Sequence, residues 1–272
     1  MEKVVLVTGG SSGIGKSICT VLSAKGYKVY GTTRNPEKID EKIPFNLVKM
    51  DVTDWDSVKS CVEFILSREQ KIDVLINNAG IGIISAVEDV SENEFFAVFR
   101  TNVLGPLYVM QNVLPHMRKQ KQGLVINVAS IAGHVALPYR GIYCASKAAL
   151  QRLTESLRME LKPYHVHACI LDPGDFKTSI NENRLIAKNV INQTSPYTSE
   201  TLRIEKTVIN EVNHSLDPIY IGKTIHKIIQ SKKVKPYYTC GKFVQRFALV
   251  AKRLLSVQIF EKIIERKYNL SN

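Results

Sequence analysis

The sequence predicts an α/β fold, a single doubly wound domain in which helices flank a central parallel sheet. Three observations predict it. Short runs rich in Val and Ile alternate with longer helical stretches, and these runs are apolar throughout, as expected for strands that are covered on both faces. The connections are short, and neither a Pro-, Gly- or Ser-rich linker nor an internal repeat interrupts them. With 272 residues the chain can bury a large core without disulfides.

The expected elements follow one another along residues 1–241. Strands are expected at residues 4–8, 28–32, 46–51, 74–77, 124–130, 165–171 and 236–240. Helices are expected between them, near residues 13–25, 55–69, 92–119 and 142–162. Because each connection is short, we expect these elements to form one domain.

Two segments depart from the alternation. Residues 175–216 are polar and follow the sixth strand, and ligands of doubly wound sheets bind beyond the carboxyl ends of the strands, so this segment is expected to be a substrate loop. Residues 242–272 are expected to form an amphipathic helical extension of the same domain. One apolar face there contains Phe243, Phe247, Val250, Ala251 and Leu254, and another contains Phe260, Ile263, Ile264 and Tyr268.

Cysteine spacing and charge narrow the class of protein. The five cysteines form no C-x-x-C pair, which favours reduced thiols in a cytoplasmic protein without a metal site. The first strand begins too near Met1 for a signal peptide, and no apolar run has the length of a membrane span. The formal charge is +12, but residues 232–272 hold ten Lys or Arg against two Glu without a nucleic-acid-binding motif, so no nucleic-acid partner is expected.

A glycine-rich loop connects the first strand to the first helix. Its sequence is Thr8-Gly9-Gly10-Ser11-Ser12-Gly13-Ile14-Gly15. Glycines let the backbone turn sharply and approach a pyrophosphate closely, and the helix N-terminus offers unpaired N–H groups and a positive dipole end. The loop therefore predicts a dinucleotide-binding site, and the alternative is a tight strand-to-helix turn without a ligand.

Tyr143 and Lys147 stand four residues apart and therefore share one face of the fourth helix, and Ser130 ends the strand before it. A cation beside a phenol favours the phenolate, so the pKa of Tyr143 is expected to fall below the usual value of about 10. A group of this kind can exchange a proton with a carbonyl oxygen, as reversible carbonyl reduction requires. Alone, a Tyr-x-x-x-Lys pair is common on solvated or packed helix faces.

Together these motifs resemble those of the classical short-chain dehydrogenase/reductase family, which has a Rossmann-type fold, over about residues 3–240. Four further motifs carry the resemblance: Asp51-Val52, Asn77-Asn78-Ala79-Gly80, Asn102 within Thr101-Asn102-Val103-Leu104-Gly105, and Pro173-Gly174 followed by Thr178. The resemblance implies a catalytic set of Asn102, Ser130, Tyr143 and Lys147. It implies cofactor contacts from Gly9, Ser11, Ser12, Gly13, Ile14, Gly15, Asp51, Val52, Asn78, Ala79, Gly80, Tyr143, Lys147, Pro173, Gly174 and Thr178.

The resemblance also implies a role for each catalytic residue. Tyr143 would exchange a proton with the substrate oxygen, and Ser130 would hydrogen-bond that oxygen and fix its position. Lys147 would lower the pKa of Tyr143 and hold the nicotinamide ribose, while Asn102 would keep a water near Lys147 so that protons reach solvent. The cofactor would supply the hydride.

The end of the second strand indicates which nicotinamide cofactor is preferred. An enzyme that prefers NAD usually has an acid there, which binds the ribose hydroxyls, and this chain has none before Glu37. Arg34 lies where a guanidinium can pair with a 2′-phosphate, and similar family members with a basic residue there use NADP. NADP(H) is therefore expected rather than NAD, unless Arg34 is merely a solvated loop charge.

Three functional classes are compatible with such a fold. An oxidoreductase acting on a ketone, aldehyde or alcohol is favoured. A non-catalytic nucleotide-sensing or scaffold protein would typically have lost Tyr143 or Lys147, and a sugar-nucleotide epimerase would be longer, with a different glycine spacing. Two residues near the motifs are expected to have no direct chemical role: His134 lines or shapes the pocket, and Cys144 fills space in the core.

The expected substrate is a small apolar carbonyl compound or alcohol of steroid-, retinoid- or lipid-like character. Its pocket is expected to be lined by Ile81, Ile83, Ile131, Leu137, Phe176 and Tyr197. The basic extension at 242–272 has two interpretations: weak contact with an anionic membrane surface, or packing against the body with partial cover of the pocket. The resemblance also implies a homodimer or homotetramer built on the helices that begin near Glu92 and Ile142.

Overall fold

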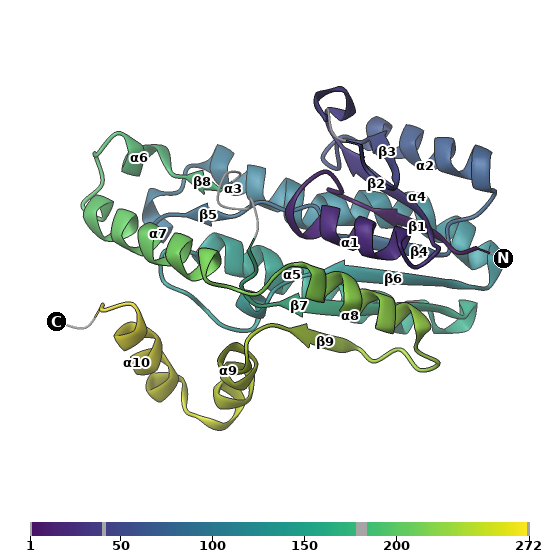
Figure 1. The fold of residues 1–272 in the computed structure, drawn as a ribbon. Helices are drawn as coiled ribbons and strands as arrows, with labels where there is room; N and C mark the ends of the chain where they lie inside the picture. Colours follow the sequence, from purple (N-terminus) through teal and green to yellow (C-terminus); the bar gives the residue numbers. More distant parts are fainter. Residues whose placement is uncertain (1, 40–41, 178–183, 271–272) are drawn as a thin grey trace.

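A parallel sheet forms the centre of the computed structural model, which describes residues 2–39, 42–177 and 184–270 (Figure 1). Within these residues the sheet has seven strands in the order β3-β2-β1-β4-β6-β7-β9. Their bounds are Val4–Val7 (β1), Lys28–Thr33 (β2), Asn46–Lys49 (β3), Val74–Asn77 (β4), Gly123–Val128 (β6), Val166–Pro173 (β7) and Tyr237–Cys240 (β9). The predicted doubly wound sheet is confirmed, and its strand order reverses between β1 and β4, where such sheets bind ligands.

Helices cover both faces of this sheet (Figure 1). They are α1 (Gly13–Ser23), α2 (Trp55–Glu69), α3 (Glu92–Phe99), α4 (Gly105–Gln120), α5 (Gly141–Glu160), α6 (Lys188–Ile191), α7 (Thr198–Asn213), α8 (Ile219–Gln230), α9 (Phe243–Leu254) and α10 (Val257–Lys267). Single turns occur at η1 (Pro36–Lys38), η2 (Val87–Asp89), η3 (Arg100–Leu104), η4 (Ile131–Gly133) and η5 (Lys162–Tyr164). A small second sheet pairs β5 (Ile83–Ile84) with β8 (Leu185–Ile186).

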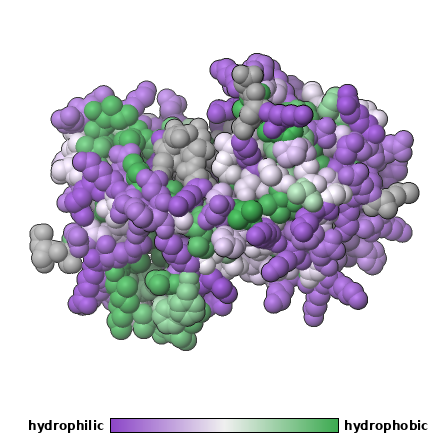
Figure 2. All heavy atoms as spheres, viewed as in Figure 1, coloured by the Kyte–Doolittle hydropathy of each residue, from purple (hydrophilic) through white to green (hydrophobic). Residues whose placement is uncertain are grey.

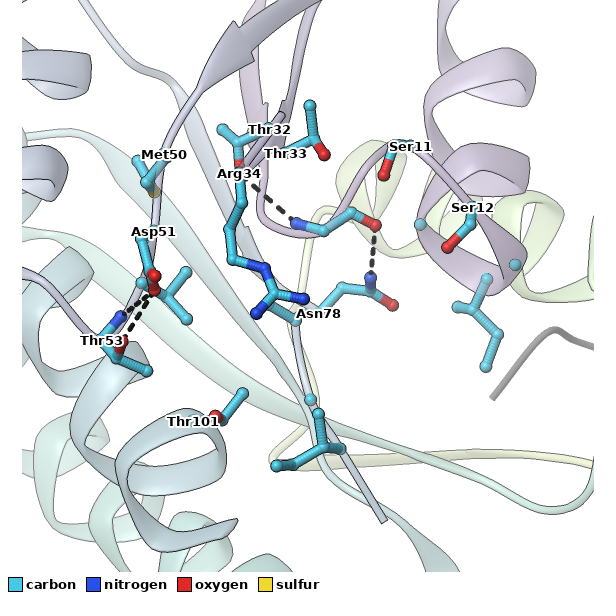
Figure 3. Close-up of a pocket in the computed structure, with 18 of the residues that line it drawn as sticks. Ser11, Ser12, Thr32, Thr33, Arg34, Met50, Asp51, Thr53, Asn78 and Thr101 are labelled. Atoms are coloured by element: carbon cyan, nitrogen blue, oxygen red, sulfur yellow. Dashed lines mark hydrogen bonds between the residues drawn. The ribbon is translucent and has the colours of Figure 1, made fainter. Parts of the chain in front are cut away.

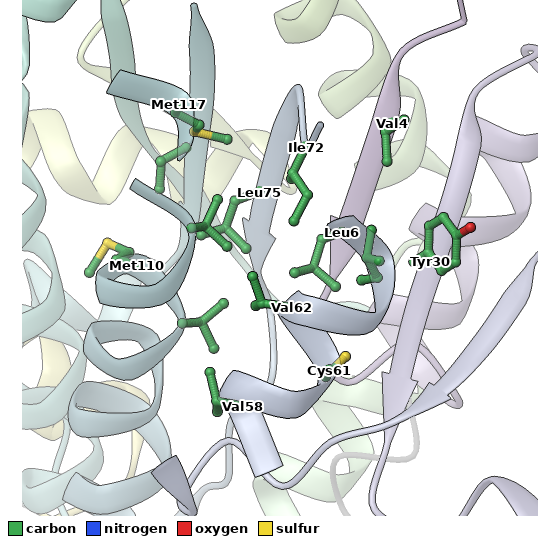
Figure 4. Packing of buried hydrophobic residues seen from close by; sticks show 14 of the residues in the cluster. Val4, Leu6, Tyr30, Val58, Cys61, Val62, Ile72, Leu75, Met110 and Met117 are labelled. Atoms are coloured by element: carbon green, nitrogen blue, oxygen red, sulfur yellow. The ribbon is translucent and has the colours of Figure 1, made fainter. Parts of the chain in front are cut away.

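The two faces of the sheet have separate apolar cores because successive strand residues point to opposite sides. Val4 and Leu6 of β1 pack with the buried faces of α2 and α4 (Figure 4). Val5 and Val7 pack on the other side, against α1 and α8. The two cores anchor the strands and helices. The loops that follow the carboxyl ends of the strands are therefore held in fixed positions.

The helix expected at 92–119 is interrupted near its middle. Five residues, Arg100–Leu104, form a π-helical turn between α3 and α4. Asn102 lies in this turn and is fully buried. Such turns often occur at functional sites, where an extra residue in the helix redirects a side chain.

The segment expected to be a substrate loop is largely helical in its described part. It contains β8, α6 and the 16-residue helix α7. Ile204, Val208 and Val212 of α7 are buried and pack with Ile84 and Tyr268 in a third apolar cluster. This spacing of four residues is typical of a helix with one buried face.

The C-terminal extension folds as the helices α9 and α10, which lie along one side of the body (Figure 1). Phe260 and Tyr268 of α10 are buried, with 4% and 1% of their surface exposed. The α10 part of the extension therefore packs against the body, as one of the two interpretations proposed, whereas none of the residues of α9 is buried. No helix in the described ranges has the length and apolar character needed to cross a bilayer.

Candidate functional site

A cavity of about 710 Å³ opens at the carboxyl ends of the strands on the β1 side of the sheet (Figure 3). Twelve of the residues predicted to contact a cofactor line it: Gly9, Ser11, Ser12, Gly13, Ile14, Gly15, Arg34, Asp51, Val52, Asn78, Ala79 and Gly80. They come from the glycine loop and from the ends of β2, β3 and β4, which are far apart in sequence. The structure thus brings together the residues that the separate motifs contribute.

The glycine loop has no room for side chains at the point where it closes. Gly9 and Gly13 have φ values of +67° and +51°, which are strained for other residues. A Cβ atom on Gly15 would lie 1.9 Å from the backbone oxygen of Gly9. The loop is therefore a tight cradle of backbone groups.

The α1 helix begins within this loop, and its N-terminus is suited to binding an anion. Among the described residues, the side chain of Ser12 at the N-cap makes no capping hydrogen bond, and the first turn holds no acidic residue. The α2 helix, by contrast, is capped by Asp54, whose carboxylate accepts from the backbone N–H of Ser57. Unpaired N–H groups and a positive dipole end are what a pyrophosphate requires, so the residues present fit a dinucleotide.

The end of β4 is tied to the end of β1 beside this loop. The Oγ1 atom of Thr8 accepts from the backbone N–H groups of Asn78, at 2.9 Å, and Ala79, at 3.0 Å. The side-chain amide of Asn78 donates to the backbone oxygens of Thr8 and Gly9. These bonds fix the wall of the cavity that the end of β4 forms.

Arg34 extends from the end of β2 into the cavity, between Asp51 and Asn78 (Figure 3). The Oδ1 atom of Asp51 accepts from both the N–H and the hydroxyl of Thr53, at 2.9 and 2.8 Å. The carboxylate is therefore held in place rather than paired with the guanidinium. Arg100 of η3 also lines the cavity, and sequence analysis had not singled it out.

Ser130 and Tyr143 meet where β6 ends and α5 begins. The Oγ atom of Ser130 accepts from the backbone N–H of Ala132 at 3.1 Å, and its side chain is near enough to Tyr143 to affect the pKa of the phenol. Burial raises the pKa of Tyr143, while the Ser130 side chain and the charge of Arg140 act to lower it. The net direction is upward, which differs from the lowered pKa expected from Lys147.

Lys147 is buried beside Tyr143, and burial disfavours its charged form. Burial lowers its pKa to about 8, although the charge of Asp172 acts to raise it. Its Nζ donates to the backbone oxygen of Val128 at 3.1 Å and lies 5.9 Å from the ring centroid of Tyr143. The pair predicted from sequence is therefore close in space, but both side chains are shifted toward their neutral forms.

Asn102 lies near Lys147, and both side chains adjoin Gly80. A Cβ atom built on Gly80 would lie 3.1 Å from the Oδ1 of Asn102 and 3.4 Å from the Nζ of Lys147. The Oδ1 of Asn102 accepts from the backbone N–H of Ile81 at 2.9 Å, and its Nδ2 donates to the oxygen of Ile81 and to the hydroxyl of Ser146. The side-chain amide is therefore used within the protein to hold this turn in place.

Pro173 and Gly174 end β7 outside the lining of the large cavity, and Thr178 lies outside the described residues. Gly174 donates its N–H to the backbone oxygen of Cys240 at 2.7 Å. A Cβ atom on Gly174 would lie 2.1 Å from the side-chain oxygen of Gln245. The α9 helix therefore covers this part of the β7 end.

The expected apolar lining is only partly found. Ile81 lines the large cavity, whereas Phe176 is 3% exposed and belongs to the core on the α1 and α8 face. Phe176 also forms an isolated parallel bridge with Leu216, outside the strands of the sheet. Ile83 is buried in β5, while Tyr197 is 37% exposed.

Cys144 and His134, which were expected to have no direct chemical role, lie in different surroundings. Cys144 is buried, as expected of a residue that fills space. The Nε2 of His134 lies 2.9 Å from Asp172, and both line a second cavity of about 250 Å³ next to α9. His134 thus shapes a neighbouring space rather than the large cavity.

Two arginines near Tyr143 had not been predicted. Arg140 donates to the hydroxyl of Tyr268 at 2.9 Å, and its Nε has no hydrogen-bond partner among the described residues. Arg184 lines the large cavity, and its Nη1 is likewise buried without a partner in that part of the chain. Local sequence gave no signal for either, since each appears as an ordinary charged residue between elements.

The comparisons with known proteins identify the family. The model of the short chain dehydrogenase family matches residues 3–189. The chain belongs to this family. A 3-ketodihydrosphingosine reductase of Bacteroides thetaiotaomicron is 39% identical over 244 residues, which cover 89% of this chain and 89% of that protein.

Solved structures of the family share the fold over nearly the whole chain. A short-chain dehydrogenase from Streptomyces avermitilis is 27% identical with a TM-score of 0.81, over 99% of this chain and 100% of that one. A family member from Burkholderia phymatum in complex with NAD has the same TM-score at 24% identity, over 93% and 92% of the two chains. Other neighbours hold NADP, so this family member's choice of cofactor depends on its own residues.

Proposed function

We propose that this protein is an NADP(H)-dependent oxidoreductase that reduces the ketone of a long-chain, lipid-like substrate to an alcohol. One observation carries the proposal: Ser130, Tyr143 and Lys147 lie together beside a glycine-loop cavity suited to a dinucleotide. We assign the catalytic role to these three residues and to Asn102. All four lie in the one domain that we propose for residues 1–241.

We assign each part of the cofactor to a different element of the fold. NADP(H), when bound, supplies or accepts the hydride at the substrate carbon. The glycine loop and the N-terminus of α1 would hold its pyrophosphate, and Arg34 its 2′-phosphate. Asp51 and Val52 would contact the adenine, and the residues after β4 and β7 would hold the nicotinamide end.

Proton transfer is proposed to start from a neutral Tyr143. Because burial raises the pKa of its phenol, the hydroxyl keeps its proton at neutral pH and can donate it to a ketone oxygen. Ser130 would hold that oxygen in position. Lys147, with a pKa of about 8, can exchange protons near neutral pH, and Asn102 would keep a water beside it that leads to solvent.

The proposed substrate class rests on the relative that is 39% identical. That protein is a 3-ketodihydrosphingosine reductase, and the match covers 89% of this chain. The ketone of such a substrate lies on a long apolar chain, which agrees with the lipid-like substrate expected from the sequence. We therefore propose a long-chain 3-keto compound as the substrate.

The test is NADPH oxidation with 3-ketodihydrosphingosine as substrate. We expect turnover by the wild type and a loss of at least about 100-fold in kcat for Tyr143→Phe, since the variant lacks the transferred proton. NADPH binding, followed by nucleotide fluorescence, should be unchanged. Tyr164→Phe is the matched control, because Tyr164 lies in η5, after the C-terminus of α5.

Two outcomes would count against this proposal. Normal turnover by Tyr143→Phe would remove Tyr143 from the reaction. NADPH binding without turnover of this or any other ketone would favour the alternative, a nucleotide-sensing or scaffold protein on the same fold.

A further inference from the structure

The α9 helix is oriented with its apolar face outward. Phe243, Phe247 and Leu254 are exposed to 78%, 58% and 78%, and Val244 and Val250 to 76% and 49%. Apolar residues at this spacing normally face a protein core. An outward apolar face of this size therefore indicates a contact that the single chain does not make.

This orientation is fixed by polar contacts on the inner face. Gln245 donates from its side-chain amide to the carboxylate of Asp175 and accepts from the Asp175 backbone N–H at 3.3 Å. Gly174 leaves the space for this amide. On the same face, the Lys252 ammonium lies 5.1 Å from the ring centroid of Phe260 in α10. Turning the apolar face inward would break all of these contacts.

The neighbouring helix α10 continues the exposed apolar surface. Val257, Ile259 and Ile263 are exposed to 54%, 52% and 47%, although Phe260 and Tyr268 are buried. Apolar side chains of α9 and α10 gather at the lower edge of the molecule in Figure 2. We call the exposed residues of this surface, Phe243, Val244, Phe247, Val250, Leu254, Val257, Ile259 and Ile263, the apolar edge.

Basic residues border the apolar edge. At about 100° per residue, the exposed apolar residues of α9 fall within an arc of about 120°, and Lys242, Arg246 and Arg253 lie together along one side of it. All three are exposed. Residues 242–270 contain seven Lys or Arg against two Glu, a formal charge of +5. An apolar helix face bordered by Lys and Arg is the pattern of helices that lie in the interface of anionic membranes.

We propose that the apolar edge lies on the surface of an anionic lipid bilayer. The apolar side chains would enter the acyl region, and the bordering basic residues would contact the lipid phosphates. A second copy of this chain is the less suitable occupant, because pairing the two surfaces would bring two segments of charge +5 together.

The position of α9 links this surface to the candidate active site. The helix contacts η4, which begins directly after Ser130, and covers Gly174 at the end of β7. A bilayer under the apolar edge would therefore lie close to the site proposed for a lipid-like ketone. The docking proposal itself does not depend on that reaction, since it concerns binding alone.

The test is co-sedimentation of the full-length protein with vesicles. We expect binding to vesicles of phosphatidylcholine with phosphatidylglycerol, little binding to phosphatidylcholine alone, and weaker binding as salt rises. The double variant Phe243→Gln/Phe247→Gln should lower the partition coefficient by at least about tenfold. Arg246→Glu/Arg253→Glu should do the same for the anionic vesicles.

The matched controls change residues that are similarly exposed but lie outside the apolar edge. Met159→Gln/Ile191→Gln removes two apolar residues exposed to 60% and 62%, and Lys59→Glu/Lys119→Glu makes the same change in charge. Both controls should bind vesicles as the wild type does. Circular dichroism and thermal unfolding would verify that all four variants are folded.

Three results would overturn the proposal. The first is no binding of the wild type to either vesicle. The second is equal binding to both vesicles, or binding that the Phe243→Gln/Phe247→Gln variant retains. The third is self-association in sedimentation velocity, lost in that variant and unaccompanied by vesicle binding, which would make a second copy the occupant. Ketone reduction by soluble protein is measured separately, so failure of the proposed function would be distinguishable.

Discussion

The Nζ of Lys147 lies 5.9 Å from the ring centroid of Tyr143, and the pKa values of the two side chains are displaced in opposite directions. Burial raises the pKa of the phenol and lowers that of the ammonium to about 8. Both displacements favour the neutral form, because removal from water penalises charge. Lys147 therefore loses its proton nearer neutral pH than an exposed lysine would, whereas Tyr143 holds its proton more firmly than an exposed tyrosine.

Lys147→Met should change how stability depends on pH. The pKa of Lys147 is about 8 in the folded protein, against an ordinary value of 10.5, so the folded chain binds fewer protons than the unfolded chain between these pH values. The contribution of this residue to the free energy of unfolding therefore rises with pH through that window. Below pH 8, burial of the charged ammonium lowers the free energy of unfolding by up to about 3 kcal/mol. We expect the free energy of unfolding of the wild type to gain about this amount relative to Lys147→Met between pH 7.5 and about 10.5.

Urea unfolding of both proteins across this pH range measures the effect. Lys59→Met is the control, because Lys59 is exposed on α2 and its replacement should leave the pH dependence unchanged. Parallel curves for the wild type and Lys147→Met would show that the pKa of Lys147 is not lowered.

Gly15→Ala should damage the cofactor loop. Its Cβ would lie 1.9 Å from the backbone oxygen of Gly9, so the loop must open to accept it. We expect a loss of about 1–3 kcal/mol in stability and at least about a tenfold weaker affinity for NADPH. Isothermal titration and thermal unfolding measure the two effects.

Gly82→Ala is the matched control for this change. A Cβ at Gly82 would meet Arg184 at 3.6 Å, an ordinary van der Waals contact. This variant should bind NADPH as the wild type does. Equal affinity in Gly15→Ala would mean that the pyrophosphate does not contact the loop.

Arg34→Asp should reverse the proposed preference for NADPH. Arg34 lines the cavity at the end of β2, and the described residues at that strand end include no acid before Glu37 that could bind ribose hydroxyls. Loss of a charge-assisted hydrogen bond to a phosphate should lower kcat/KM for NADPH about 10- to 100-fold, with little loss for NADH. Steady-state kinetics with both cofactors gives the ratio.

Lys38→Asp makes the same change in charge at an exposed position of η1 that does not line the cavity. It should leave the cofactor ratio within about twofold of the wild type, since exposed charges at a distance are screened. An unchanged ratio in Arg34→Asp, or a preference of the wild type for NADH, would exclude the 2′-phosphate contact.

The sheet and the cofactor cavity were predictable because their signals are local. Each strand is a short apolar run, and each motif follows its strand directly, so the parallel sheet brings the motifs to one edge. The helix α7 was missed because its segment is polar overall. Its buried residues Ile204, Val208 and Val212 nevertheless have helical spacing. That periodicity was a usable signal, and composition concealed it.

Other features could not be read from local sequence. The π-turn at Arg100–Leu104 depends on tertiary contacts of Asn102 with Ile81 and Ser146, which no helical pattern records. The raised pKa of Tyr143 depends on burial, and Arg140 is held by Tyr268, 128 residues away in sequence. Contacts of this separation follow from the packing of the extension against the body.

Arg140→Gln should move the pH dependence of alcohol oxidation. Oxidation needs Tyr143 as the phenolate, and the charge of Arg140 acts to lower the pKa of that phenol. Without this charge the pKa of Tyr143 rises further, so the rising limb of kcat plotted against pH should shift to higher pH.

Tyr268→Phe removes the 2.9 Å hydrogen bond but keeps the guanidinium charge, so its rising limb should stay near that of the wild type. It should cost about 1 kcal/mol of stability, as a lost buried hydrogen bond does. Equal shifts in both variants would assign the effect to packing of α10 rather than to charge, and no shift in either would separate Arg140 from the reaction.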